Sequence, residues 1–441
     1  MQTARVIAVP GRKYTLTITA RGEGGISLGA VEFADRYSPM RVGTPSQSFE
    51  LTPQWQTFTF TFTPSDATMY LSPFFEATGW LGHADIRNPS LEDTVAPGKI
   101  SIAASDYVFD LGSAVTLALT TDHGPVKLLL YGPGGVPAGP GGPFGGSDAW
   151  IDHFQQAFAI DSGPGVATTV TIELHAEALP GFYRAVAVDL TTGQTATTNF
   201  SLYPKATADE FRSLASKIKL PDGAKLVFLG DSLTDFYRGR NYVDLVSRAI
   251  AKTHGDKVQV FNAGIGGNNI DQIEKRLTKD VIERKATHVF IFEGANDSKR
   301  NYNPASGLKD VWALPYELHE ATYRKVVERI RDEAGAKVIV MTMAPGDQRI
   351  LEPFRERARA FKRSINFFCL PEDTAKAVAL QKQIARDFQL PVIDTHAHLQ
   401  AILDRNETAE YLHVDDGVHI SEHGNREVAL LVLRYLAATY K

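Results

Sequence analysis

The second half of the chain alternates short apolar runs with helical patterns, and this alternation constrains its fold more than any other feature. The apolar runs are read as buried strands and cover residues 225–229, 258–261, 288–292, 337–341 and 391–394. Apolar residues recur at helical spacing between them, over residues 242–252, 270–283, 316–333 and parts of 352–388. Strands that alternate with helices form parallel βαβ units. Residues 206–441 are therefore predicted to form a three-layer α/β domain around a five-stranded parallel sheet.

Polar motifs follow the first three of these strands directly. They read Gly230-Asp-Ser232, Asn262-Ala-Gly-Ile-Gly-Gly267 and Gly294-Ala-Asn-Asp297. Open α/β sheets place their ligands beyond the carboxyl ends of the strands. The three motifs are therefore expected to meet at one rim of the sheet.

A fourth motif, Asp416-Gly-Val-His419, precedes the final helical pattern. Ser421 is a plausible N-cap for this helix, which places the motif on the same rim. We expect the helix to face the sheet through Val428, Leu431, Val432 and Tyr435. Together the four motifs supply a hydroxyl nucleophile, oxyanion donors and an Asp/His pair, the parts that an acyl-transfer site needs.

The four motifs, in this order, resemble those of the SGNH hydrolase superfamily, also called GDSL-type esterases. The four residues that name the superfamily map onto Ser232, Gly267, Asn296 and His419. The resemblance covers residues 206–441 and implies the flavodoxin-like SGNH fold. It also implies an oxyanion hole made of the backbone N–H groups of Ser232 and Gly267 and the side-chain amide of Asn296.

The same resemblance implies a catalytic triad of Ser232, His419 and Asp416. A serine hydroxyl becomes a good nucleophile when a base takes its proton, and His419 is the expected base. Asp415 is an adjacent alternative to Asp416, but the Asp-x-x-His spacing of the superfamily selects Asp416. The reading requires no cofactor and no metal.

Three other motifs point to different sites, and each lacks a feature that its site requires. The glycines of residues 264–267 follow a strand, but Asn269 stands where a dinucleotide-binding fingerprint requires its third glycine. His396 and His398 follow a strand like a metal-binding pair, but little chain remains to supply further ligands. Ser232 lacks the Gly-x-Ser-x-Gly elbow of ordinary α/β-hydrolases.

Composition bounds the function further. The net charge is −5 and the chain has no basic tract, which argues against nucleic acid as a partner. No apolar run approaches the roughly 18 residues that a membrane span requires. The chain begins with Met1-Gln-Thr-Ala4, which leads into a strand-like segment without a visible signal peptide. We expect a secreted or periplasmic protein, in which case this chain is a mature or trimmed form.

Residues 1–95 have the alternating pattern of β-strands. Phe58, Phe60 and Phe62 alternate with threonine, which predicts a half-buried strand. The order of strands and aromatics over this region resembles the jelly-roll carbohydrate-binding modules of polysaccharide-degrading enzymes. The opening strand of such modules is not evident, so we expect the module to be cut short at its start. Aromatic side chains that could stack on sugar are Trp55, Tyr70, Phe74, Phe75 and Trp80, although most aromatic residues belong to cores.

Residues 98–204 are predicted to form a second β-sandwich. Six strands are expected, at residues 99–102, 115–119, 126–130, 169–173, 184–188 and 197–202. The segment Leu179-Pro-Gly-Phe-Tyr183 is similar to the tyrosine corner of immunoglobulin-like domains. The Gly/Pro-rich segment 132–146 is expected to be a loop, and reaching over the active site as a lid is the alternative.

These features predict a multidomain serine esterase that removes O-acyl groups, in particular acetyl groups, from a polysaccharide or its oligosaccharides. The acylated carbohydrate is then its partner. Two alternatives stay open at this point. One is a lipolytic or arylesterase-like hydrolase of broad acyl specificity, and the other is a non-catalytic glycan-binding protein.

Overall fold

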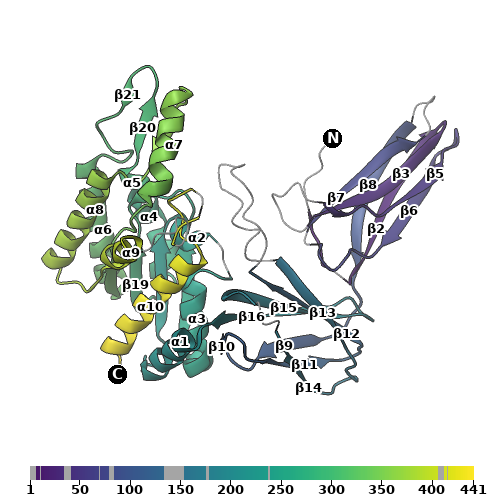
Figure 1. Cartoon of the computed structure of the whole chain (residues 1–441), viewed down its shortest axis with the longest axis horizontal. Coiled ribbons are helices and arrows are strands. Elements are labelled where there is room, and N and C mark those ends of the chain that lie inside the picture. Colours follow the sequence, from purple (N-terminus) through teal and green to yellow (C-terminus); the bar gives the residue numbers. More distant parts are fainter. Residues whose placement is uncertain are drawn as a thin grey trace. The chain divides into compact units, whose positions relative to one another are not determined.

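The structure is a computed structural model, and it divides into two compact units, Met1–Lys205 and Ala206–Lys441 (Figure 1). It describes residues 6–9, 11–33, 41–68, 70–78, 84–133, 153–174, 178–236, 239–405, 412–414 and 416–441. The second unit contains the α/β domain, and the bounds 206–441 expected for that domain stay a prediction. A further division of the first unit, near residue 97, stays a prediction.

The second unit is built on a five-stranded parallel sheet, as the sequence predicts. Its strand order is β18-β17-β19-β22-β24. The strands are β17 (Lys225–Gly230), β18 (Gln259–Gly264), β19 (His288–Phe292), β22 (Lys337–Met341) and β24 (Val392–Ile393). The first strand in sequence lies between the second and the third, so the three loops that follow β17, β18 and β19 are neighbours at one edge.

Helices cover both faces of this sheet, which gives three layers (Figure 1). One face packs against α4 (Ile270–Leu277), α6 (Tyr316–Ala334) and α8 (Pro371–Asp387), and the other against α3 (Tyr242–His254) and α10 (Glu422–Thr439). Strand β17 shows why both faces are apolar. Val227 and Leu229 join the core on the first face, whereas Phe228 stacks edge-on against Tyr242 of α3. Successive side chains of a strand point to opposite faces.

The remaining elements of this unit are short or lie at the margins. They are α1 (Lys205–Lys217), α2 (Ser232–Asp235), η2 (Gly255–Lys257), the π-helical turn η3 (Thr278–Ile282), α5 (Ala295–Ser298), β20 (Arg300–Asn303), β21 (Gly307–Leu308), α7 (Gln348–Ala360), β23 (Ile365–Phe367) and α9 (Thr395–Leu403). The predicted helix over 270–283 is thus α4 followed by η3. The helical pattern within 352–388 resolves into α7 and α8.

The last helix begins where the sequence predicts, because the Ser421 side chain accepts a hydrogen bond from the Gly424 N–H. Its buried face differs in part from the expected one. Val428 and Val432 are fully buried, but Leu431 is only partly buried, and Leu436 is buried in its place. The apolar surface of this helix is wider than the stripe chosen from the sequence, since α10 packs on α3 and α9 as well as on the sheet.

In the first unit, residues 6–94 form two facing antiparallel sheets. One contains β1 (Val6–Ile7), β7 (Tyr70–Thr78), β3 (Gly25–Phe33), β4 (Arg41–Gly43) and β5 (Ser46–Glu50), and the other contains β6 (Gln56–Phe62), β2 (Lys13–Gly22) and β8 (Ala84–Thr94). Phe60 and Phe62 point into the shared core while Thr59 and Thr61 are exposed. The alternation predicted for this strand is confirmed.

Residues 100–203 form a second pair of sheets. They contain β10 (Val108–Asp110), β16 (Thr195–Tyr203), β15 (Gly181–Asp189), β12 (Val126–Gly132) and β13 (His153–Ile160) on one side, and β14 (Thr168–Ile172), β11 (Val115–Thr121) and β9 (Ile100–Ala104) on the other. The Tyr183 hydroxyl donates to the Leu179 carbonyl over 2.8 Å, the hydrogen bond expected of a tyrosine corner. The immunoglobulin-like assignment itself stays a prediction. Segment 134–146 of the predicted loop lies outside the described residues.

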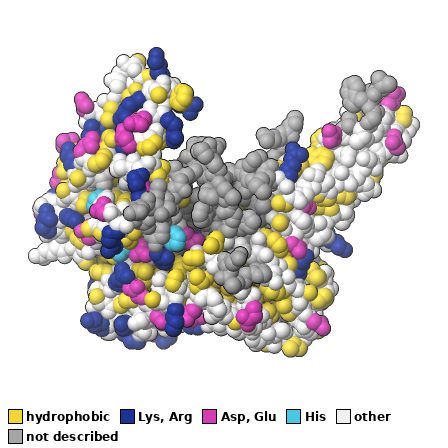
Figure 2. All heavy atoms as spheres, viewed as in Figure 1, with side chains coloured by type: hydrophobic (Ala, Val, Ile, Leu, Met, Phe, Trp, Pro, Cys, Tyr) yellow, Lys and Arg dark blue, Asp and Glu magenta, His cyan; other side chains and the backbone are white. Residues whose placement is uncertain are grey.

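Charges of both signs are interspersed over the face of the molecule that Figure 2 shows. This mixture agrees with the small net charge of −5. Within the described residues, no helix combines the length and the apolar character that crossing a bilayer would take.

Candidate active site

Ser232 lies at the carboxyl end of the sheet, where β17 turns into the short helix α2. Asp231 caps this helix, since its Oδ1 accepts a hydrogen bond from the Leu233 N–H over 2.9 Å. Asp231 is fully buried and Ser232 is 9% exposed. The cap fixes the turn, and the turn places the serine at the rim.

His419 is held by a loop that is closed at its base. Backbone hydrogen bonds join Val414 to His419 and Leu412 to Ser421. At the tip, Gly417 has a φ of 71°, and a Cβ there would meet Ile350 and Leu351 side-chain atoms at 3.0 Å. A larger residue at position 417 would therefore be both strained and crowded.

The three residues predicted as a triad lie in line. His419 Nε2 is 2.8 Å from Ser232 Oγ, and His419 Nδ1 is 2.5 Å from Asp416 Oδ2. The Phe236 ring stacks on the imidazole with centroids 4.7 Å apart and planes 23° apart. Asp416 and Phe236 thus restrict the ring in two directions. No motif in the sequence pointed to this role of Phe236, because the contact arises only from the tertiary structure.

Asp416 also orders its own loop. Its Oδ1 accepts the N–H groups of Val418 (2.8 Å) and His419 (2.9 Å). Burial alone would raise the pKa of Asp416, but the hydrogen bonds and the charge of His419 outweigh it and bring that pKa below its ordinary value. The carboxylate therefore stays ionised beside the imidazole. The alternative residue, Asp415, lies outside the described residues.

Gly267 lies in the loop that follows β18, next to the turn of Ser232. The Gly266 N–H donates to Asp235 of α2 over 2.8 Å, which ties this loop to the serine turn. Gly267 has a φ of 82°, which L side chains rarely adopt. In the part of the chain that the structure describes, the N–H groups of Ser232 and Gly267 have no hydrogen-bond acceptor. Both are available to a ligand at the rim.

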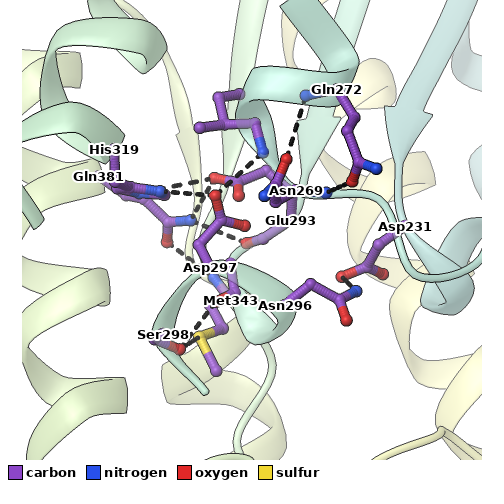
Figure 3. A network of polar contacts seen from close by, with 12 residues as sticks. Asp231, Asn269, Gln272, Glu293, Asn296, Asp297, Ser298, His319, Met343 and Gln381 are labelled. Atoms are coloured by element: carbon purple, nitrogen blue, oxygen red, sulfur yellow. Dashed lines mark hydrogen bonds and ion pairs between the residues drawn. The ribbon is translucent and has the colours of Figure 1, made fainter. Parts of the chain in front are cut away.

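Asn296 lies in α5, which follows β19. Strand β19 is the neighbour of β17 on the side opposite to β18. Asn296 is 6% exposed, and its Nδ2 lies 3.4 Å from Asp231 Oδ2 (Figure 3). Its Oδ1 accepts a hydrogen bond from Lys299 Nζ over 3.1 Å. The amide therefore belongs to the same rim as Ser232, as the motif order predicts.

Arg276 of α4 links the ends of β17 and β18, where the loops of Ser232 and Gly267 begin. Its guanidinium donates to the carbonyls of Gly230 (3.0 Å) and Ala263 (2.6 Å) and to the side chain of Asn268 (3.0 Å). Asp280 balances its charge. The sequence analysis missed this arginine, because only the fold brings it to the ends of β17 and β18.

A buried polar network lies beneath Asn296 (Figure 3). Asp297 Oδ1 accepts from His319 Nδ1 and from the Ile270 N–H, each over 2.9 Å. Since Ile270 begins α4 and Asp297 follows Asn296, this carboxylate links the loop of Gly267 to that of Asn296. Gln381 donates to the Glu293 carbonyl over 2.9 Å and accepts from the Met343 N–H over 2.8 Å.

The pKa values of Glu293 and Asp297 are shifted in opposite directions. Burial and the charge of Asp297 hold the pKa of Glu293 well above its ordinary value. Burial would also raise the pKa of Asp297, but the hydrogen bond and charge of His319 outweigh it and lower that pKa. The potential ligand atoms of Glu293, Asp297 and His319 lie within 4.8 Å of one another, close enough to hold a metal ion. A metal ion at this position would have to displace the proton that Glu293 favours and compete with the hydrogen bond between Asp297 and His319. The sequence analysis missed this group.

His396 and His398, singled out from the sequence, make contacts with other parts of the domain, and the neighbouring His413 packs under the His419 loop. His398 pairs with Glu427 over 3.1 Å, and the His396 backbone N–H donates to Thr342. His413 is fully buried and its Nε2 lies 2.7 Å from the Pro345 carbonyl, so it supports the loop of His419. These contacts are structural.

Three of the aromatic residues considered for sugar binding are Trp55, Tyr70 and Trp80, and the structure describes the first two. The guanidinium groups of Arg21 and Arg87 lie over the Trp55 ring, 4.8 and 4.1 Å from its centroid. The two guanidinium groups compete with a sugar for the ring faces that they cover. Tyr70 is partly buried in β7, and Trp80 lies outside the described residues. Sugar binding by these three side chains stays a prediction.

Comparisons with known proteins agree with the site. Residues 228–427 match the GDSL-like Lipase/Acylhydrolase family. An acetylxylan esterase of Geobacillus stearothermophilus is 28% identical over 231 residues, which are 49% of this chain and 95% of that protein.

Solved structures were compared as well. The crystal structure of an acetylxylan esterase from Geobacillus stearothermophilus has 25% sequence identity and a TM-score of 0.38, covering 50% of this chain and 96% of that one. A lipase/acylhydrolase from Enterococcus faecalis has 27% identity and a TM-score of 0.35, covering 49% and 97%.

The family match spans residues 228–427, a range that includes Ser232, Gly267, Asn296 and His419. The five-stranded parallel sheet carries these four residues at one rim. The C-terminal half of this chain is a GDSL-like lipase/acylhydrolase domain of the SGNH type.

Proposed function

We propose that the protein is a serine esterase that removes acetyl groups from an acetylated carbohydrate. One observation carries the proposal: His419 lies within hydrogen-bond distance of both Ser232 Oγ and Asp416. A nucleophile, a base and a group that orients the base are thereby aligned. The family match to acylhydrolases supports the same reading.

In the proposed mechanism, Ser232 Oγ attacks the ester carbonyl while its proton passes to His419 Nε2. The negative charge that develops on the carbonyl oxygen is bound by the N–H groups of Ser232 and Gly267 and by the Asn296 amide. When the tetrahedral intermediate collapses, the sugar oxygen leaves and takes the proton from His419. Water then attacks the acetyl-serine with His419 as base, which releases acetate and restores the Ser232 hydroxyl.

The carbohydrate substrate is the finer part of the proposal. It is supported by the sequence relative, whose name is acetylxylan esterase. We propose an acetylated plant or microbial polysaccharide, or its oligosaccharides, as the substrate class. An extracellular or periplasmic location fits such a substrate, because polymers of this size do not enter cells.

The first unit is proposed to assist on polymers. If residues 1–95 are a carbohydrate-binding module, they raise the local concentration of ester groups by tethering. Residues 98–204 would then act as an immunoglobulin-like spacer. Neither role is needed for small esters, since all five proposed catalytic and oxyanion residues lie in the second unit.

The decisive experiment combines a small ester with labelling of the nucleophile. Ser232→Ala should lower turnover of 4-nitrophenyl acetate by about a thousandfold or more, because the members of a triad act as one unit. Thr234→Ser, a matched change in the same turn, should leave most of the activity. A serine-directed phosphonate should label Ser232 in the wild type alone. Retention of more than roughly a tenth of the activity in Ser232→Ala would refute the assignment.

Substrate class is tested separately, with acetylated xylo-oligosaccharides and with a series of 4-nitrophenyl esters of increasing acyl length. Release of acetate from the oligosaccharides and a preference for acetyl support the proposal. A preference for long acyl chains with no release of acetate would favour the lipolytic alternative. No labelling and no turnover on any ester would leave only a glycan-binding role.

A further inference from the structure

The Asn296 side chain lies between two groups of opposite charge. Lys299 Nζ is 3.1 Å from its carbonyl oxygen, and Asp231 Oδ2 is 3.4 Å from its amide nitrogen. Figure 3 shows the Asp231 side of this arrangement. An ammonium group has only donors, and a carboxylate has only acceptors. One orientation of the amide therefore satisfies both neighbours, whereas a flipped amide would face its NH2 group to the ammonium and its oxygen to the carboxylate.

We propose that Lys299 and Asp231 are positioning residues that lock the Asn296 amide in the orientation that binds the oxyanion. With Oδ1 held by Lys299 and one N–H directed at Asp231, the second N–H of Nδ2 is left for the substrate. The inference rests on the proposed function, because it assigns the amide a role in the reaction. It adds two residues, neither of which was assigned a role from the sequence.

The position of Lys299 favours this role over that of a mobile surface lysine. It directly follows α5 and is only three residues from Asn296, so both side chains leave the same short turn. Its side chain is partly buried, and the ammonium lies 5.1 Å over the Phe368 ring. A cation over an aromatic face is attracted to it, which limits where the ammonium can lie.

Asp231 contacts both the Asn296 amide and the turn that carries the nucleophile. Its Oδ1 caps the turn of Ser232 through the Leu233 N–H, and its Oδ2 faces Asn296. Both carboxylate oxygens are therefore engaged. An asparagine at this position offers one acceptor oxygen and could not serve both groups. Burial raises the pKa of Asp231 to about 6, against the opposing effect of the Leu233 hydrogen bond, so the carboxylate is still mainly ionised at pH 7 or above.

The test starts from Lys299→Met, which keeps much of the side-chain length and removes the donor and the charge. We expect kcat for 4-nitrophenyl acetate at pH 8 to fall about tenfold or more with KM within about twofold, since the amide acts on an oxyanion that forms beyond the ground state. Lys299→Arg, which keeps a cationic donor, should recover part of the loss. Lys376→Met is the matched control, because its ammonium also lies over an aromatic ring (Tyr316, 3.8 Å) but Asn296 is not among its contacts.

A double-mutant cycle separates positioning from general stability. In an Asn296→Ala background, Lys299→Met should change kcat by less than about twofold, because its effect passes through the amide. An equal loss in both backgrounds, an effect on KM alone, or an unchanged kcat in the single variant would each overturn the inference. Asp231→Asn is expected to follow the same pattern.

Failure of the inference can be told apart from failure of the proposed function. In one case the wild type hydrolyses the ester, Ser232 is labelled and Asn296→Ala lowers kcat, but Lys299→Met leaves kcat unchanged. Only the positioning role of Lys299 and Asp231 is then wrong. If the wild type is inactive and unlabelled, the esterase proposal itself fails. Urea denaturation of each variant shows whether a loss of activity reflects unfolding.

Discussion

Asp416→Asn offers the sharpest test of the proposed triad, because it changes one atom and leaves the loop in place. The Oδ1 of Asp416 accepts the N–H groups of Val418 and His419, and an asparagine can keep both bonds. Its NH2 group would then face His419 Nδ1. An amide N–H can only donate, so Nδ1 becomes an acceptor and the imidazole proton moves to Nε2. In this tautomer, Nε2 cannot take the proton of Ser232.

The expected loss is about 10⁴ in kcat, or about 5 kcal/mol in the activation free energy, as for triads held in the wrong tautomer. The assay is turnover of 4-nitrophenyl acetate at pH 8, with thermal unfolding measured in parallel. The melting temperature should change little, because the backbone contacts persist. Asp271→Asn, which removes an exposed carboxylate paired with Lys275, is the control and should be fully active. An Asp416→Asn variant with more than a tenth of wild-type kcat would refute the geometry of the base.

Four further outcomes are expected. Arg276→Met should lower both kcat and the melting temperature, because it removes hydrogen bonds to Gly230, Ala263 and Asn268; a normal kcat would show that the rim holds its shape unaided. Chelators should leave turnover unchanged, and loss in EDTA with rescue by zinc would contradict this. Between pH 6.5 and 4, the unfolding free energy of the wild type should decrease, and that of His423→Gln should decrease less, as measured by urea denaturation. Burial lowers the pKa of His423 to about 4, so in this window the unfolded chain takes up a proton that the folded one does not, and stability is lost as pH falls. A chain that starts at Ala206 should keep its activity on 4-nitrophenyl acetate but lose activity on acetylated polysaccharide, whereas equal losses on both would assign the first unit a purely stabilising role.

The sequence was most informative where short apolar strands end in motifs. All five strands of the parallel sheet lie within a few residues of their predicted bounds, because strands buried on both faces read as continuous apolar runs. The order of the motifs also gave the neighbours of Ser232, since a motif after a parallel strand can only lie at one edge of the sheet.

Other features could not be read from local patterns. Strand β3 is buried along most of its length, but its two glycines and its glutamate interrupt the apolar pattern. Nothing in the local sequence distinguishes Lys299 from other lysines, because its contact with Phe368 depends on the tertiary structure. The pairing of Asp297 with His319 depends on how α6 packs on the sheet, which is a property of the tertiary structure.

Ser232 and His419 are 187 residues apart in the sequence and 2.8 Å apart in the structure. Contacts of such long sequence separation slow folding, and we expect this one to form after the local helices. A collapsed intermediate with native helices could therefore give a full far-ultraviolet circular dichroism signal and no turnover. Recovery of ester hydrolysis during refolding would then time the arrival of the His419 loop at the serine turn. A lag between recovery of the circular dichroism signal and recovery of ester hydrolysis would measure the lifetime of the compact intermediate that lacks the assembled site.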